Sequence, residues 1–327
     1  MSAAPSAGAL PPGIAIIGPT GSGKSALAMR LAAALPVEII SVDSAQVYRG
    51  LDIGTAKPTT EERHAVAHHL LDIREPEQVY SAGEFRADCL GLIDEIAARG
   101  RMPLLVGGTM LYYRALFGGI AELPTADASL RAQLDARAAR DGWPALHAEL
   151  AARDPVAAAR IHPNDAQRIQ RALEVLAVSG RTMDAHWAGG SSQPAPLFAR
   201  WHICMLEPAD RTRLHAVLAQ RLAAMLRAGF VAEVRALLAR DLDAHSPVLR
   251  LVGYRQLMEH CRGAESLEAA TERALAATRQ LAKRQLTWMR SRKLLPYGAT
   301  VLHVDPFDSD SVAALSRGLI EATATPC

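Results

Sequence analysis

Eight residues near the start of the chain have the types and spacing of a phosphate-binding loop, or P-loop. They run from Gly18 to Ser25 as Gly-Pro-Thr-Gly-Ser-Gly-Lys-Ser and match every fixed position of the pattern G-x4-G-K-[ST]. Glycines allow successive backbone N–H groups to turn toward phosphate oxygens, Lys24 supplies a positive charge, and the Ser25 hydroxyl can coordinate Mg²⁺. The loop therefore predicts a site for linked phosphates and Mg²⁺, but it leaves the reaction open.

A carboxylate, Asp43, directly follows a second apolar segment, Val37–Val42. If both apolar segments are parallel strands, their carboxyl ends share one edge of a sheet, and Asp43 faces the phosphates. There it can bind Mg²⁺ or accept a proton from a nucleophile. The alternative is a helix N-cap that satisfies backbone N–H groups. The position at the sheet edge favours the functional interpretation.

The segments around these residues alternate between strand and helix patterns. Gly13–Ile17, Val37–Val42 and Met102–Val106 are short apolar runs, and Ser25–Leu35 and Ala82–Arg99 have apolar residues at helical spacing. Strands that alternate with helices predict an α/β fold with a parallel sheet and right-handed crossovers.

The pattern becomes entirely helical after about residue 120 and returns to a strand at His202–Leu206. A long amphipathic segment, Arg211–Arg240, follows and is predicted to break near Gly229. We therefore predict an α/β fold with a P-loop NTPase-like parallel sheet core and a helical insertion domain. The predicted limits are a disordered tail at 1–12, a core at 13–120 and 200–315, an insertion at 121–199 and a C-terminal end at 316–327.

Composition restricts the class of protein. Half of the 327 residues are hydrophobic and the net charge is only +2, so a folded chain is expected and nucleic acid is neither required nor excluded. The four cysteines are scattered without zinc-ligand spacing, which is typical of a reduced, cytoplasmic protein. No apolar run approaches the ~20 residues that a membrane span needs.

Several long motifs in one order resemble the bacterial tRNA dimethylallyltransferases, also called tRNA isopentenyltransferases. They span about Gly13 to Arg290, nearly the whole chain. The resembling blocks are Gly18–Ser25, Asp43–Pro58, His68–Asp72, Gly107–Tyr112, Asn164–Glu174, Val252–Gln256 and Thr278–Gln285.

The resemblance implies transfer of a dimethylallyl group from dimethylallyl diphosphate to N6 of adenosine 37 in tRNAs that read codons beginning with U. The P-loop would then hold a departing diphosphate, and Asp43 would take the proton from the N6 amine. The implied catalytic residues are Asp43, Lys24, Thr20 and Arg211, although Arg211 can equally be a solvated helix cation. The implied diphosphate-binding residues are Gly18, Pro19, Thr20, Gly21, Ser22, Gly23, Lys24 and Ser25, with Ser25 as the Mg²⁺ ligand.

Two basic segments favour an RNA acceptor. Between Ala274 and Leu295 there are six cations, one tryptophan and no acidic residue, which differs from the mixed charge of an ordinary solvated helix face. In the predicted insertion, Arg168 and Arg171 share a helix face, although Arg171 can instead pair with Glu174 three residues later. Gln46 is suited to bidentate hydrogen bonding with a flipped adenine.

The resemblance implies contact with the tRNA anticodon stem-loop at the following residues: Asp43, Ser44, Ala45, Gln46, Thr109, Arg131, Gln167, Arg168, Ile169, Gln170, Arg171, Arg250, Leu251, Val252, Gly253, Tyr254, Arg255, Lys283, Arg284, Gln285, Leu286, Thr287, Trp288, Met289 and Arg290. The expected partners are tRNA and dimethylallyl diphosphate, with Mg²⁺ as cofactor, and the protein is expected to be a cytoplasmic monomer without membrane contact.

Three alternatives remain at this point. A P-loop small-molecule kinase would bind ATP and release ADP. An adenine-nucleotide isopentenyltransferase would share the donor but use a free nucleotide as acceptor. A non-catalytic RNA-binding P-loop protein would bind tRNA and turn nothing over.

Overall fold

The computed structural model describes residues 11–119, 123–124, 127–189, 198–243, 246–291, 294–296 and 298–324. The chain divides into two compact units. We call the first, Met1–Gly118 together with Ala195–Cys327, the core unit, and the second, Gly119–Pro194, the helical unit.

A six-stranded parallel sheet forms the centre of the core unit. The strand order is β3-β2-β4-β1-β5-β6, and every neighbouring pair is parallel. β1 lies between β4 and β5, so the P-loop that follows it emerges in the middle of the sheet edge. The strands are β1 (Gly13–Ile17), β2 (Val37–Val42), β3 (His68–His69), β4 (Met102–Gly107), β5 (Trp201–Leu206) and β6 (Thr300–Val304).

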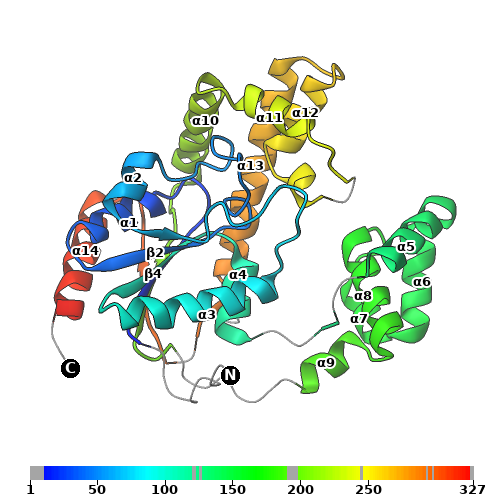
Figure 1. The fold of residues 1–327 in the computed structure, drawn as a ribbon, viewed down its shortest axis with the longest axis horizontal. Helices are drawn as coiled ribbons and strands as arrows, with labels where there is room; N and C mark the ends of the chain where they lie inside the picture. The colour runs from blue at the N-terminus through cyan, green and yellow to red at the C-terminus, as the bar shows by residue number, and fades with distance from the viewer. Residues whose placement is uncertain are drawn as a thin grey trace. The chain divides into compact units, whose positions relative to one another are not determined.

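Helices cover both faces of this sheet (Figure 1). Successive strand residues alternate between two apolar clusters, as in Ile16 and Ile17, because side chains along a strand point to opposite faces. α1 and α14 pack on one face, and α3, α4, α10 and α13 contribute to the cluster on the other. The helices of the core unit are α1 (Lys24–Ala32), α2 (Thr60–Ala65), α3 (Ala82–Ala98), α4 (Met110–Gly118), α10 (Arg211–Arg227), α11 (Phe230–Leu238), the 3-10 helix η1 (Pro247–Arg250), α12 (Tyr254–Cys261), α13 (Leu267–Met289) and α14 (Ser309–Ala324).

The helical unit has its own apolar core. Leu146, Leu150, Ile169 and Leu173 are nearly inaccessible and pack together across its helices. Its helices are α5 (Ala128–Asp141), α6 (Trp143–Arg153), α7 (Pro155–Arg160), α8 (Ala166–Ser179) and α9 (Met183–Gly189). Aspartates Asp127, Asp154 and Asp165 cap α5, α7 and α8, so these helices begin where side-chain oxygens satisfy free N–H groups.

The predicted fold class is confirmed, since a parallel α/β sheet carries a separate helical segment. The predicted break in the long amphipathic segment is also confirmed, because Gly229 has a φ of 104° between α10 and α11. No helix in the described part of the chain is both long enough and apolar enough to span a membrane.

The compact units begin and end at other residues than the predicted domains. Phe198 belongs to the core unit, because its buried ring packs edge-on against Phe117 and Trp201. The limit at residue 315 falls inside α14, whose apolar face packs on the sheet. Most of the predicted tail lies outside the described residues, but the Pro11 carbonyl accepts a hydrogen bond from the Trp201 indole.

Candidate active site

The loop between β1 and α1 has the backbone geometry that an anion site needs. Gly21 and Gly23 have φ values of 78° and 75°, which glycine adopts without the steric cost that a Cβ would bring. α1 begins at Lys24 directly after the loop, so its first backbone N–H groups lack intrahelical acceptors and face the loop.

Lys24 is folded back onto the loop that carries it. Its Nζ donates to the Pro19 carbonyl at 2.7 Å. Burial of the amine, together with the nearby charge of Arg221, lowers the pKa of Lys24 to about 7, although Asp43 acts in the opposite direction. The amine is therefore only partly protonated near neutral pH, and a bound anion would favour its charged form.

Two side chains from distant helices fix Thr20 in the same loop. Gln285 of α13 accepts from the Thr20 backbone N–H at 2.9 Å and donates to the Gly108 carbonyl at 2.8 Å. Arg221 of α10 donates to the Thr20 hydroxyl at 3.1 Å. Arg221 is mostly buried, and this burial lowers its pKa while Asp43 raises it.

Asp43 lies at the end of β2, at the same sheet edge. Its Oδ1 accepts from the backbone N–H groups of Ala45 at 2.8 Å and Gln46 at 3.4 Å. No helix begins here, because residues 44–47 form a turn, so Asp43 holds that turn and the helix N-cap that the sequence left open is not observed. Among the described residues no hydrogen bond involves Oδ2, so one carboxylate oxygen remains available while the other holds the turn.

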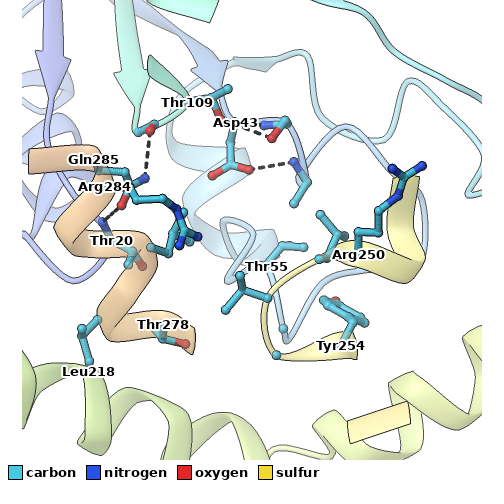
Figure 2. A pocket seen from close by; sticks show the side chains of 18 of the residues that line it. Thr20, Asp43, Thr55, Thr109, Leu218, Arg250, Tyr254, Thr278, Arg284 and Gln285 are labelled. Atoms are coloured by element: carbon cyan, nitrogen blue, oxygen red, sulfur yellow. Dashed lines mark hydrogen bonds between the residues drawn. The ribbon is translucent and has the colours of Figure 1, made fainter. Parts of the chain in front are cut away.

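Two adjoining cavities meet at this edge, and Figure 2 shows the larger of them from close by. The larger, which we call the large chamber, has a volume of about 460 Å³ and is lined in part by apolar residues of α4, α10 and α11. The smaller, the small chamber, has a volume of about 100 Å³ and contains Lys24 and Ser25 of the P-loop. Six residues line both chambers, namely Thr20, Asp43, Thr55, Gly108, Arg221 and Gln285.

This arrangement separates two kinds of chemistry. The small chamber offers cations and hydroxyls to an anion, whereas the large chamber offers apolar surface and room for an organic group. Asp43 and Arg221 stand at the junction with opposite charges. A reaction that separates an anionic leaving group from an organic fragment fits this geometry.

Many of the residues that the sequence analysis selected line the two chambers. Figure 2 shows Thr278, Arg284 and Gln285 of α13 on one side, with Arg250 and Tyr254 across from them. The selected residues that line a chamber are Thr20, Lys24, Ser25, Asp43, Ser44, Ala45, Gln46, Thr109, Arg250, Leu251, Val252, Gly253, Tyr254, Arg284, Gln285 and Trp288.

Arg221 is the main site residue that the sequence analysis missed. Arg211, selected instead, is exposed at the first position of α10 and lines neither chamber. A signal was present, because Arg221 lies beside Leu218 and Leu222 on the apolar face of the helix. A lone arginine on such a face is unusual unless something there needs its charge.

The sequence predicted that the Gln46 amide faces a flipped base. In the structure this amide bonds within the protein instead. Its Oε1 accepts from the Ser41 hydroxyl at 2.9 Å, and its Nε2 donates to the Thr55 and Ala56 carbonyls, both at 3.2 Å. Because both ends of the amide are engaged within the protein, Gln46 supports the loop that contains Thr55.

The basic helix α13 divides its predicted contacts between a cavity and the core. Arg284, Gln285 and Trp288 line the large chamber, whereas Leu286 and Met289 are buried in the apolar core and cannot reach RNA. The remaining selected residues on this segment, Lys283, Thr287 and Arg290, are exposed.

The segment before α12 contributes a rigid wall to the large chamber. The Gly253 N–H donates to the Gln256 side chain at 2.9 Å, and the Tyr254 hydroxyl donates to Glu233. Glu233 also accepts from three successive N–H groups at residues 52–54. Arg255, selected with this segment, is exposed and lines neither chamber.

The arginines of the helical unit are mostly paired. Glu174 is fully buried and accepts from Arg131 at 2.8 Å and from Arg171 at 2.5 Å. Burial opposes the charge on Glu174, but these hydrogen bonds outweigh it and hold its pKa below the usual value. The intrahelical pairing that the sequence left open is therefore the one observed.

Other predicted contacts of the helical unit are partly corrected. Ile169 is completely buried in the apolar core of this unit and is not available to RNA. Gln170 donates to Asp135 at 2.8 Å. Gln167 and Arg168 are exposed on α8, and Arg168 lies 3.5 Å from the half-buried carboxylate of Asp165.

The donor set of the small chamber fits a divalent cation that also binds phosphate. Ser25 and Asp43 offer one hydroxyl and one carboxylate to the same cavity, and Mg²⁺ typically combines one or two such protein oxygens with substrate phosphates and water. The described residues contain no cluster of three or more histidine, cysteine or carboxylate side chains that could hold a metal alone.

Comparisons with known proteins agree with this geometry. A family model described as IPP transferase matches residues 46–292. The tRNA dimethylallyltransferase of Bordetella avium (strain 197N) is 59% identical over 86% of this chain and 90% of its own length, and that of Burkholderia thailandensis is 58% identical over 84% of this chain and 86% of its own length.

Solved structures are also similar. The tRNA isopentenylpyrophosphate transferase of Bacillus halodurans matches 94% of this chain and 95% of its own, with a TM-score of 0.64 and 34% identity. A eukaryotic dimethylallyltransferase, described as acting on tRNA, matches 94% of this chain and 77% of its own, with a TM-score of 0.78 and 26% identity.

Proposed function

Because the chain belongs to the IPP transferase family, we propose that it transfers a dimethylallyl group from dimethylallyl diphosphate to N6 of adenosine 37 in tRNAs reading codons that begin with U. The observation that carries this proposal is the junction of the two chambers, where Asp43 and Arg221 face a polar and a largely apolar cavity at once. In the reaction a C–N bond forms, the C–O bond to diphosphate breaks, and N6 loses a proton.

The diphosphate would occupy the small chamber. Lys24, the N–H groups at the start of α1 and Arg221 would neutralise the charge that develops as the leaving group departs. The charged amine of Lys24 has three N–H donors, so it can bind phosphate oxygens besides the Pro19 carbonyl, and a nearby anion favours this charged form. Ser25 would hold Mg²⁺, which would supply further positive charge to the leaving group.

The dimethylallyl group would lie against the apolar side of the large chamber, near Leu218 and Leu222. The available oxygen of Asp43 would accept the proton from N6. The lone pair of that amine is delocalised into the ring, so a positioned base contributes roughly 10²–10⁴ to the rate. The fixed turn at Ala45 keeps the carboxylate in place.

The adenine must leave its stack to reach Asp43, as bases do in enzymes that modify them. The mouth of the large chamber is lined by Arg250, Arg284 and Trp288, which suit phosphate contact and base stacking. The exposed cations of α13 and Arg168 of the helical unit would contact the anticodon stem-loop. The names of the relatives favour tRNA over a free adenine nucleotide or a kinase substrate as acceptor.

A mass measurement on tRNA tests the proposal. The purified protein is incubated with Mg²⁺, dimethylallyl diphosphate and an unmodified tRNA that reads codons beginning with U, and the nucleosides are then analysed. We expect one adenosine to gain the mass of a dimethylallyl group in place of one hydrogen. The control is the same tRNA with guanosine at position 37, and equal or absent addition in both would contradict the proposal.

Size-exclusion chromatography with light scattering tests the further proposal that the protein is a monomer.

A further inference from the structure

Gln285 lies on the face of α13 that lines the large chamber. Thr278, Leu281, Arg284 and Trp288 share this face at spacings of three and four residues, as one side of a helix requires. Position alone would therefore make Gln285 another residue for RNA contact. Its hydrogen bonds point elsewhere.

The side-chain amide of Gln285 joins two segments that are distant in sequence. Its oxygen accepts from the Thr20 N–H in the P-loop, and its nitrogen donates to the Gly108 carbonyl between β4 and α4. An amide is required, because a carboxylate has no N–H to donate and an apolar side chain of the same length can make neither bond.

The space around this amide is closely filled. A Cβ atom at Gly108 would lie 2.6 Å from Nε2 of Gln285 and 2.9 Å from the carbonyl oxygen of Gly18. Glycine at position 108 is thus needed for the amide to reach both partners. The contact joins the P-loop, the end of β4 and α13 at one point.

This contact continues to the proposed base. Thr109, next to Gly108, accepts from the Ser44 N–H at 3.0 Å, and Ser44 follows Asp43. On the other side, Thr20 accepts from Arg221 through its hydroxyl. The bonds of Gln285 therefore set the distance between the loop that would hold the diphosphate and the segment that carries Asp43.

We infer that Gln285 is a positioning residue of the transfer reaction, which fixes the P-loop relative to Asp43, and that it does not bind tRNA. The inference rests on the proposed function for its kinetic part only. Because the geometry of the P-loop does not depend on the acceptor, binding of inorganic diphosphate with Mg²⁺ is an independent measure of the same role.

The test compares Gln285→Met with Gln280→Met. Gln280 is exposed on the same helix and lines neither chamber, so it provides a matched control. In Gln285→Met we expect roughly 10- to 100-fold weaker diphosphate binding and a similar loss of kcat/KM for dimethylallyl diphosphate, because two partly buried backbone groups lose their partner. The Kd for the anticodon stem-loop should stay within about twofold of that of the unaltered protein, because the lost hydrogen bonds join parts of the protein and none of them joins RNA. The control should change neither.

A second variant approaches the contact from the other partner. Gly108→Ala keeps Gln285 but displaces its amide, and it should weaken diphosphate binding in the same direction. Thermal melting monitored by circular dichroism establishes that each variant is folded.

Weaker RNA binding with unchanged diphosphate binding in Gln285→Met would overturn the inference, as would two folded variants with unaltered diphosphate binding. If the unaltered protein transfers nothing to tRNA while Gln285→Met still loses diphosphate affinity, the proposed function fails and the positioning role stands.

Discussion

Charged residues of the core unit and of the helical unit are used in opposite ways. At the sheet edge of the core unit, Asp43 and Arg221 face cavities, and Asp43 keeps one oxygen without a hydrogen bond among the described residues. In the helical unit, Arg131 and Arg171 are held by the buried Glu174. The same residue types therefore line the cavities of the proposed active site in one unit and form ion pairs within the protein in the other.

The physical reason lies in what surrounds each charge. The carboxyl ends of parallel strands leave a crevice between loops, where a charged group can face a bound ligand. On α8, Glu174 is three residues beyond Arg171 and points into the apolar core, so its charge must be compensated within the protein. An arginine is informative about RNA only when no buried carboxylate holds it.

Replacing the proposed base should give the largest effect. Asp43→Asn keeps an oxygen that can accept from the Ala45 N–H but cannot take a proton, so we expect the transfer rate to fall by roughly 10²–10⁴. Single-turnover assays measure the rate, and fluorescence anisotropy measures stem-loop binding, which should be unaltered. Near-normal transfer by the folded variant would show that Asp43 only holds the turn at residues 44–47.

The proton equilibrium of Lys24 should respond to the anion. The chain has four lysines, so lysine-selective isotope labelling gives few NMR signals, and Lys24→Arg identifies the one of interest. In the free protein this amine should titrate near pH 7, and with bound diphosphate its pKa should move back toward 10.5. The charged form is the one that binds diphosphate, so affinity should rise as the pH falls through 7. A signal that titrates near 10.5 without ligand would contradict the buried, uncharged state.

Breaking the pairing of the helical unit should reduce stability. Arg171→Met leaves Glu174 with fewer donors in a buried position, and we expect a loss of about 2–3 kcal/mol in the free energy of unfolding. Urea denaturation followed by circular dichroism measures it. If the variant unfolds normally but loses stem-loop affinity, Arg171 binds RNA and the contrast between the two units fails.

The matched exposed arginine should give the smallest effect. Arg168→Met on the same helix should leave the free energy of unfolding within about 0.5 kcal/mol, because the side chain is exposed and its pairing with Asp165 is loose. If Arg168 contacts a phosphate, stem-loop binding should weaken slightly, and the slope of log affinity against log salt concentration should become shallower by about one. Binding with an unaltered salt dependence would remove Arg168 from the proposed RNA surface.

Local sequence was sufficient for the features that depend on short-range rules. The spacing of glycines, lysine and serine at 18–25 predicted the P-loop, and alternating apolar segments predicted the parallel sheet and its separate helical segment. Gly229 was expected to break a long helix, and it does so with a positive φ. In each case the pattern that predicted the feature lies within a short segment of the chain, although the strands then pair over long distances in sequence.

The sequence by itself determined that Gly18–Ser25 and Asp43 lie at the same edge of the sheet, because the carboxyl ends of parallel strands share one edge. Only the tertiary structure decided which distant side chains complete the site. Arg221 and Gln285 lie 201 and 265 residues from Thr20 in sequence, yet both bind it. The tertiary structure also decided which predicted RNA contacts are engaged within the protein, namely Gln46, Leu286 and Arg171. Burial and the choice of hydrogen-bond partner depend on packing between distant segments, which no local pattern records.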